Sequence, residues 1–293
     1  MEVPPDVISA LQAADASDLY PVTGTESYDL PVLKTGILQF DSGAVLQLTS
    51  LDAPFLIVCA RQLLLRGPAP QATITRDISV VATADAPGAA GVPGKDGEQN
   101  MPGSGGTGGS AGAAGQSAAQ LPPLYLFMEE MVGHPNAPVD WLNFWLLMPG
   151  IDGGGGGVGG SGGDGGPGAA GSPGYAGGIF GFGSYGPTYG TSGGPGGLGG
   201  AGGPGGSGSD GGQLFYVGPE AALAQMSWIK VVNTGGVAGQ GGTGGGGGAG
   251  GQGGYGAVNG SSGGNGANGQ RGQPGTKGSV SLVVMPSLDD LYT

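Results

Sequence analysis

The residues with the clearest capacity for a chemical task are five aromatic side chains gathered in one short segment of a 293-residue chain. Glycine separates them, and glycine between large aromatic groups is typical of adaptable recognition loops. The segment therefore predicts a binding surface, although the same rings could instead pack together and seal the end of a folded unit. The five residues are Tyr175, Phe180, Phe182, Tyr185 and Tyr189.

Residues able to act as an acid, a base or a nucleophile are few and poorly placed. The single histidine, His134, lies in a proline-rich loop and is interpreted as a surface residue. Glu129 and Glu130 are adjacent, and neighbouring residues of a strand point to opposite faces, so they are not expected to work as a pair. Cys59 lies in the apolar run FLIVCA and is expected to be buried. We therefore predict no catalytic residue and no enzyme, and an enzyme using Glu129 or Asp140 is the least favoured alternative.

Composition argues against several other classes of site. Eight Lys and Arg against 21 Asp and Glu give a net charge of -13 and a pI near 4.1, whereas nucleic-acid binding needs a basic face. One histidine and one cysteine do not suit a metal centre of the His or Cys type. Two segments, 159–164 and 205–210, begin like the calcium-binding nonapeptide repeat, but glycine stands where that repeat needs a large apolar residue. No metal and no cofactor are expected.

Glycine organises most of the chain. The sequence holds 74 Gly, nearly all of them after residue 83. In four series glycine occupies every third position, and only Asn100 and Ala257 interrupt them. A flexible linker has no reason to keep such a phase, so the period indicates a regular structure. The series run over 88–115, 150–177, 190–211 and 236–278.

Three structures fit a period of three. A collagen triple helix needs glycine at every third position and is rich in proline, which is scarce in these tracts. A bundle of polyglycine II helices has the same three-residue turn without internal hydrogen bonds. Its backbone groups must therefore pair with neighbouring helices, which only glycine allows to approach closely. A disordered glycine-rich linker is the third possibility. We favour the bundle because many triplets read Gly-Gly-X.

Each tract must fold back, since apolar segments flank it on both sides. Breaks in the phase predict the turns at 95–102, 179–189 and 255–259. The last tract further indicates an inner limb of small residues followed by an outer limb that carries Asn265 and Asn268. The first and last turns supply secondary candidates for binding, namely Lys95, Asp96, Glu98, Tyr255 and Asn259.

The segments between the tracts predict one β-rich body. Short apolar or alternating runs bounded by Gly, Pro and Asp turn signals predict strands over 36–82, and residues 6–16 predict a short helix with Asp6 as N-cap. The expected fold class is a mainly β body, a short β-solenoid or a sandwich, with the tracts folded into a polyglycine II bundle. The expected organisation is a body over 1–83, a tract over 84–115, body strands over 116–149, a tract over 150–211, body strands over 212–235, a tract over 236–278, and a C-terminal strand and tail over 279–293.

The Gly-Gly-X and Gly-X-Y tracts resemble two groups of proteins in the style of their repeat. One group is the collagen-like, glycine-rich surface proteins of bacteria. The other is the distal tail-fibre adhesins of T-even-type phages, in which polyglycine II helices form a sandwich and the turns bind a receptor. A springtail antifreeze protein has a similar glycine bundle. The adhesin resemblance implies that the turns at 95–102, 179–189 and 255–259 carry the binding function.

Two functions follow as expectations. The first is a non-enzymatic structural subunit of an extracellular fibre or surface assembly, suggested by the low content of charged residues, 10%, and by the rigid tracts. The alternative is a receptor-binding adhesin that uses its turns. The expected partners are further copies of the chain or a cell-surface receptor, with no nucleic acid and no membrane insertion. The expected location is extracellular, at a cell surface or in a virion, with no classical signal peptide visible.

Overall fold

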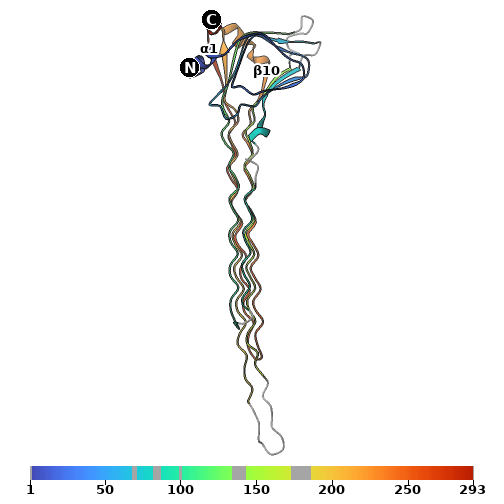
Figure 1. Ribbon diagram of the computed structural model, residues 1–293, viewed down its shortest axis with the longest axis vertical. Coiled ribbons are helices and arrows are strands. Elements are labelled where there is room, and N and C mark those ends of the chain that lie inside the picture. The colour runs from blue at the N-terminus through green and yellow to red at the C-terminus, as the bar shows by residue number, and fades with distance from the viewer. Residues whose placement is uncertain are drawn as a thin grey trace, which may run out of the picture.

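The computed structural model describes residues 2–67, 71–81, 87–98, 101–133, 143–172 and 186–292. These residues form a head that contains both chain termini and a long shaft that leaves the head on one side (Figure 1). The three glycine tracts build the shaft, and the remaining segments build the head. The candidate residues His134, Asp140, Tyr175, Phe180, Phe182 and Tyr185 lie outside the described residues.

The head is built from two sheets in which every described pairing is parallel. The first sheet has six strands in the order β1-β3-β5-β7-β9-β11, and the second has five in the order β10-β8-β6-β4-β2. The strands are β1 (Ser17–Val22), β2 (Thr25–Tyr28), β3 (Val32–Phe40), β4 (Ala44–Leu48), β5 (Leu56–Leu65), β6 (Gln71–Arg76), β7 (Leu124–Val132), β8 (Asn143–Leu147), β9 (Leu214–Gly218), β10 (Ile229–Val232) and β11 (Val280–Val284).

The chain passes back and forth between the sheets, because odd-numbered strands belong to the six-stranded sheet and even-numbered strands to the five-stranded sheet. The main core lies between them, and its largest fully buried side chains include Phe40, Phe144 and Tyr216, among which Phe40 and Phe144 make an edge-to-face contact. Strands such as LIVCARQLLL read as continuous apolar runs because both of their faces are covered, as parallel sheets require.

Helices are few and lie outside the sheets. The α-helices are α1 (Pro5–Ala13) and α2 (Glu220–Ala224), with 3-10 turns η1 (Ile78–Val81), η3 (Gln225–Trp228) and η4 (Asp289–Leu291). A second apolar cluster joins Leu11 of α1 and Leu291 of η4 to Val283 and to the outer face of the six-stranded sheet. The N-cap of α1 is Pro4 and not Asp6, because the helix begins with Pro5, whose missing N–H costs nothing there.

The fold-class prediction needs correction. The structure is an α/β fold with parallel sheets of six and five strands and few helices, in place of a mainly β body that carries a polyglycine II bundle. The described residues of the tracts belong to no helix and no strand, apart from one bridge between Ser172 and Thr188. The period of three does not identify a helical class; it reflects how closely the backbones of neighbouring limbs approach one another.

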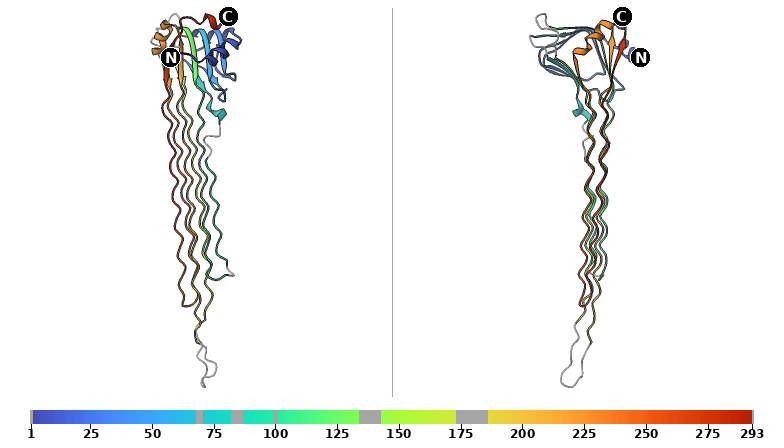
Figure 2. Two further views of the ribbon diagram at one scale, coloured as in Figure 1. Left: turned by 90° about the vertical axis from the view of Figure 1, so that its left-hand side faces the viewer. Right: turned by 180° about the vertical axis from the view of Figure 1, so that it is seen from behind.

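Each tract replaces the connection from an even-numbered strand to the next odd-numbered strand. The outgoing limbs 87–98, 150–172 and 235–254 follow β6, β8 and β10, and the returning limbs 103–120, 186–212 and 257–279 lead into β7, β9 and β11. The tracts therefore lie side by side in the order of the strands above them, as Figure 2 shows in its left view. The head templates the shaft, because strand order determines limb order.

Backbone hydrogen bonds join the limbs with a period of three. Gly200 illustrates the pattern, since its N–H donates to the carbonyl of Gly160 at 2.8 Å while its own carbonyl accepts from Gly245 at 2.8 Å. A Cβ added at most in-phase glycines would collide with the backbone of a neighbouring limb. Glycine is required at these positions by close approach, since no described residue there has a positive φ except Gly103 and Gly256 at the turns.

Short polar side chains accept hydrogen bonds from backbone N–H groups that do not pair with the carbonyl of a neighbouring limb. Along the edge of the third tract, Asn259, Asn265 and Asn268 of the returning limb accept hydrogen bonds from the N–H groups of Gly253, Gly247 and Gly244, at 2.8–3.0 Å. These side chains occupy donors that would otherwise be open to another chain. The edge of the shaft is thereby closed to strand-like pairing at these positions.

Candidate functional site

The turns of the first and third tracts lie in the part of the shaft that is remote from the head, and the described limbs of the second tract extend beyond both of them (Figure 1). The chain reverses between Glu98 and Ser104, where the hydroxyl of Ser104 donates to the carbonyl of Glu98 at 3.0 Å, and again at Tyr255–Gly256. In the second tract, an antiparallel bridge joins Ser172 and Thr188. Of the five aromatic residues predicted to form the binding surface, Tyr189 is described.

The first turn contributes charged side chains, but one of them has a structural task. The N–H of Asp164 donates to Oδ1 of Asp96 at 2.9 Å, which ties the first tract to the second. The N–H of Lys95 donates to Oγ1 of Thr107 at 2.7 Å. Lys95, Asp96 and Glu98 are all exposed. Asp96 therefore belongs to the framework of the turn, while the side chains of Lys95 and Glu98 remain accessible from solvent.

The third turn brings two of the predicted residues together with a ring from the second tract. Gly256 adopts a φ of 71°, and its Cα lies so close to Tyr189 that an added Cβ would meet the ring at 2.6 Å. The N–H of Gly190 donates to the carbonyl of Tyr255 at 2.8 Å. Asn259 is engaged as a backbone acceptor, so it supports the turn and is not free to bind.

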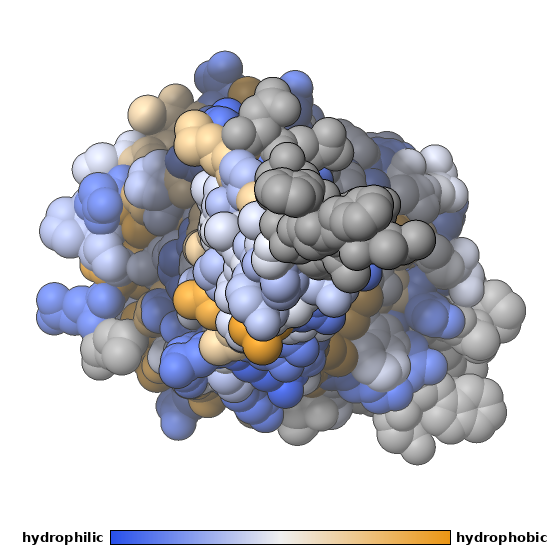
Figure 3. Space-filling model, turned by 90° about the horizontal axis from the view of Figure 1, so that it is seen from below, coloured by the Kyte–Doolittle hydropathy of each residue, from blue (hydrophilic) through white to orange (hydrophobic). Residues whose placement is uncertain are grey.

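The apolar groups around this turn face solvent. Tyr189 is 73% exposed, Tyr255 51% and Val258 71%. Seen from below, a few apolar residues stand out singly beside the pale, glycine-rich limbs (Figure 3). Sequence reasoning missed Val258, although it follows Ala257, where the glycine phase breaks. We call Tyr189, Tyr255 and Val258 the tip patch.

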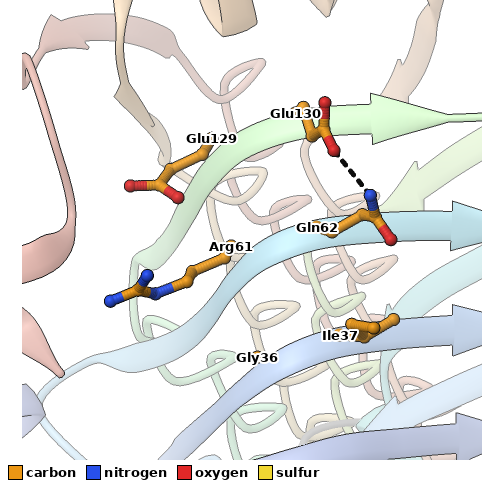
Figure 4. A pocket seen from close by; sticks show the side chains of 6 residues that line it. All are labelled: Gly36, Ile37, Arg61, Gln62, Glu129 and Glu130. Atoms are coloured by element: carbon orange, nitrogen blue, oxygen red, sulfur yellow. Dashed lines mark hydrogen bonds between the residues drawn. The ribbon is translucent and has the colours of Figure 1, made fainter.

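Apart from the turns, a concavity lies on the outer face of the six-stranded sheet. It has a volume of about 500 Å³ and is lined by residues of β3, β5 and β7, among them Arg61, Gln62, Glu129 and Glu130 (Figure 4). The prediction that Glu129 and Glu130 point to opposite faces is wrong. Inward-facing residues of β7 run 124, 126, 128 and then 131, so the alternation slips by one residue and leaves two consecutive residues facing outward.

The same slip occurs in β5, which adjoins β7, and in β3, the strand beyond it, where the inward series passes from Ala60 to Leu63 and from Leu33 to Leu38. The three neighbouring strands therefore bend at the same place in their register. Gly36 of β3 lies at this bend, where a larger residue would be too close, since an added Cβ would lie 2.8 Å from the carbonyl oxygen of Asp18. A single sequence cannot reveal such an aligned slip, since each strand alone still reads as apolar and alternating.

The polar groups of this concavity hold the C-terminal segment. Oε1 of Glu129 accepts the N–H of Leu288 at 2.9 Å, and Arg61 forms an ion pair with Asp289 at 3.0 Å. Glu130 accepts from the amide of Gln62. These carboxylates are occupied by structural partners, so the arrangement anchors residues 285–292 and offers no pair of free acids for catalysis.

Cys59 lies beneath that anchored segment. The thiol is fully buried, its Sγ lies 3.5 Å from the hydroxyl of Tyr292, and that hydroxyl donates to the carbonyl of Thr35 at 2.6 Å. Burial raises the pKa of the Cys59 thiol from 9.0 to about 11. The position fits a structural cysteine and not a nucleophile, which needs a lowered pKa.

This environment predicts slow alkylation. At pH 8.5 the folded chain should react with iodoacetamide at least tenfold more slowly than the chain in denaturant, because both the thiolate population and access are reduced. Replacing Tyr292 by alanine should restore much of the rate by uncovering the thiol, whereas Tyr292→Phe should restore little, since burial is the main cause of the raised pKa. Equal rates for wild type and Tyr292→Ala would contradict a role for Tyr292 as a cover. Mass spectrometry of quenched samples measures the rates.

The aspartates of the calcium-like segments also tie limbs together. The N–H of Ala249 donates to Oδ1 of Asp164 at 2.8 Å. Both the N–H and the hydroxyl of Thr276 donate to Oδ1 of Asp210, and these hydrogen bonds lower the pKa of the Asp210 carboxyl. Among the described residues, no three His, Cys, Asp or Glu side chains converge as metal ligands would.

Comparisons with known proteins add little to this geometry. No protein-family model matches the chain, and a search of curated proteins gives no match either. A search of solved structures finds a springtail antifreeze protein from Granisotoma rainieri, described as a nine polyproline type II helical bundle. The two chains are 22% identical over 64% of this chain and 95% of that chain, with a TM-score of 0.09, which carries no argument. Within the described residues, no helix is long and apolar enough to cross a bilayer.

Proposed function

We propose that the protein is a stalked binding protein, in which the head anchors the shaft and the turns at the far end contact a ligand on a cell surface. The observation that supports the proposal is the tip patch. Near the turn of the third tract, two tyrosines and a valine remain more than half exposed, and the tyrosines are the only aromatic residues among the exposed large hydrophobic side chains of the described chain. Exposed aromatic groups held on a rigid support are common anchors of binding interfaces, because they contribute contact area at a low cost in conformational entropy.

The shaft favours this function in a second way. Its in-phase backbone N–H groups pair with neighbouring limbs over the described length, so the rod is stiff and presents its turns at a distance from the head. The charged side chains of Lys95 and Glu98 are exposed at the turn of the first tract and could add polar contacts. We expect the ligand to offer both apolar faces and hydroxyl or charged groups, as surface carbohydrates do.

A fibre subunit is the alternative function, and it makes a different demand on the head. An open fibre needs two complementary surfaces on each copy. The two edges of the head, at β1 and β2 and at β10 and β11, are not complementary. The first is closed by Tyr20 and Tyr28 among acidic residues, whereas the second is apolar. The tip patch also has no role in a fibre, so the binding protein accounts for more of the structure.

The experiment that tests the proposal compares the binding of a tip-patch variant with that of a variant on the side of the shaft. Fluorescently labelled protein is applied to a carbohydrate array and to bacterial outer-membrane vesicles. Replacing Tyr189 and Tyr255 together by serine should weaken any binding at least tenfold, since buried aromatic anchors contribute about 2 kcal/mol or more each. The control is Leu198→Ser, which removes a 66% exposed apolar residue from the side of the shaft. Unchanged binding by the tip variant, or an equal loss in the control, would contradict the proposal.

A further inference from the structure

The two ends of the stack of strands in the head are finished differently. At the N-terminal end, Tyr20 of β1 and Tyr28 of β2 meet edge to face with ring centroids 5.8 Å apart. Burial together with neighbouring acids, Glu26 and Asp29 for Tyr20, raises the pKa of these tyrosines. Edge strand β1 also carries Asp18 and Pro21. Aromatic closure, negative charge and proline are the usual means of capping a stack and protecting its edge.

Among the residues that the structure describes, none caps the opposite end in this way. Edge strand β11 reads VSLVV, without charge or proline. Val280, Leu282 and Val284 are 46%, 56% and 64% exposed. Their parallel partners in β9 are Leu214, Tyr216 and Gly218, of which Leu214 and Tyr216 belong to the core between the sheets. Paired residues of a parallel ladder share a face, so the three exposed side chains point into the space between the sheets and are left without a cover.

The strand numbers explain why the cover is missing. The six-stranded sheet ends at β11, while the five-stranded sheet ends one strand earlier, at β10. Among the described residues, no strand lies beside β10 and opposite β11. Val232 at the end of β10 is 36% exposed. The head thus lacks one strand at a defined place, next to three apolar side chains that such a strand would bury.

We propose that a second copy of this chain fills that place in a twofold dimer whose axis runs parallel to the shaft. Rotation by 180° about such an axis exchanges the sides of the two sheets and preserves the direction of every strand. It puts β11 of each copy beside β10 of the other, where the missing strand would lie. One copy can satisfy both needs at once, because β11 is the extra strand and β10 is the unpaired neighbour.

Strand direction follows from the connections. β6, β8 and β10 lead into the shaft, while β7, β9 and β11 lead out of it, so β11 and the partner subunit's β10 would pair in antiparallel fashion. The two sets of Val280, Leu282 and Val284 would face each other across the extended core. Both shafts would point the same way, and both tip patches would act on one surface.

Because the limbs continue the strands above them, the third tracts of the two copies would run beside each other below the head contact, but they would not pair through their backbones. Along the third tract, the amides of Gly244, Gly247 and Gly253 are already occupied by asparagine side chains. The adjoining limb also carries Arg271, an exposed cation. Backbone pairing between shafts is thus blocked at these positions, while the apolar edge of the head stays open. This distribution favours a closed dimer and not a lateral sheet of rods.

Sedimentation velocity and light scattering of the full chain test the dimer. Wild type should have twice the chain mass of 28.0 kDa. Leu282→Lys should shift the protein to the monomer and raise the dissociation constant of the dimer at least tenfold, because a charge would enter the apolar contact. Val284→Lys should act in the same way. The matched control, Leu198→Lys, alters an exposed leucine on the shaft, 66% exposed against 56% for Leu282, and should leave the dimer intact. Far-UV circular dichroism checks that every variant is folded.

Wild type that remains monomeric over the whole concentration series would overturn the proposal, as would open-ended filaments or dissociation by Leu198→Lys. Shaft direction is tested with Val258→Cys, labelled by a mixture of donor and acceptor dyes; Cys59 is buried and stays unlabelled. Energy transfer is expected if both tips point the same way, and its absence in a dimer would overturn the axis. The dimer does not depend on the tip ligand, since monomeric Leu282→Lys should keep single-site binding.

Discussion

Replacing Gly245 by alanine is expected to destabilise the shaft by about 1–3 kcal/mol, as overpacking typically does, whereas replacing Gly246 by alanine should not destabilise it and should raise its stability by at most about 1 kcal/mol. The two residues are neighbours in the outgoing limb of the third tract. A Cβ on Gly245 would collide with the carbonyl group of Gly160. A Cβ on Gly246 would meet no described heavy atom within 4 Å. The pair therefore separates the packing role of glycine from its other effects.

The comparison is sharp because the unfolded state contributes equally to both variants. A change from Gly to Ala reduces the conformational entropy of the unfolded chain and by itself stabilises by roughly 0.4–1 kcal/mol. Neither residue has a positive φ, so backbone strain does not enter. The two positions differ in the backbone that an added methyl group would meet. Gly245 is buried and donates its N–H to Gly200 at 2.8 Å, while Gly246 is exposed. Moving the limb away to admit a methyl group would lengthen that hydrogen bond and those on either side.

Hydrogen exchange with mass spectrometry measures the effect, since it reports on the shaft separately from the head. Gly245→Ala should increase exchange in peptides from all three tracts around this level, because the limbs are hydrogen-bonded to one another. Gly246→Ala should exchange like wild type. Thermal unfolding followed by circular dichroism gives the accompanying change in stability. Equal behaviour of the two variants would mean that the period of three does not reflect close approach of backbones.

The phase of glycine in the sequence predicts this difference without any structure. Gly245 belongs to the series that begins at Gly236, and Gly246 does not. The same reasoning located the reversals at 95–102 and 255–259, where the described chain turns. Such inferences succeed because the constraint is local and repeated. Each third residue faces the same environment, and excluding a Cβ there leaves a trace in the sequence.

Interactions between distant segments left no such trace. The prediction for Glu129 and Glu130 failed because a slip in alternation depends on three strands bending together. Asn265 was interpreted as a polar residue on an outer limb, and the sequence did not reveal that its side chain turns back to accept from Gly247. The apolar edge of β11 was likewise invisible, since VSLVV reads as an ordinary strand until the number of strands in each sheet is known.

A further contact between distant segments that the sequence does not reveal lies at the neck, the region around Arg76, Ser209 and Asn233 where head and shaft meet. Arg76 ends β6, is 3% exposed, and has no acidic partner among the described residues. Its guanidinium donates to the carbonyls of Pro122 at 3.2 Å, Met148 at 2.9 Å and Pro149 at 3.1 Å. Burial lowers the pKa of Arg76 to about 10, so the group remains a cation at neutral pH. One planar cation thus joins three points where the chain crosses between head and shaft.

Arg76→Met should therefore lower the free energy of unfolding by about 2–4 kcal/mol, because buried carbonyls that lose their donor cost about 1–3 kcal/mol each. Met148 keeps a second donor, the N–H of Gly212, so the loss falls on Pro122 and Pro149. Removing the desolvated charge offsets part of this cost. Arg76→Lys should recover little, since an ammonium cannot span three carbonyls as a guanidinium does. Arg66→Met, at an exposed side chain that follows β5, is the matched control and should be neutral in chemical denaturation. If Arg76→Met were as stable as the control, the carbonyls at the neck would have to be satisfied without the cation, and Arg76 would not be what holds shaft to head.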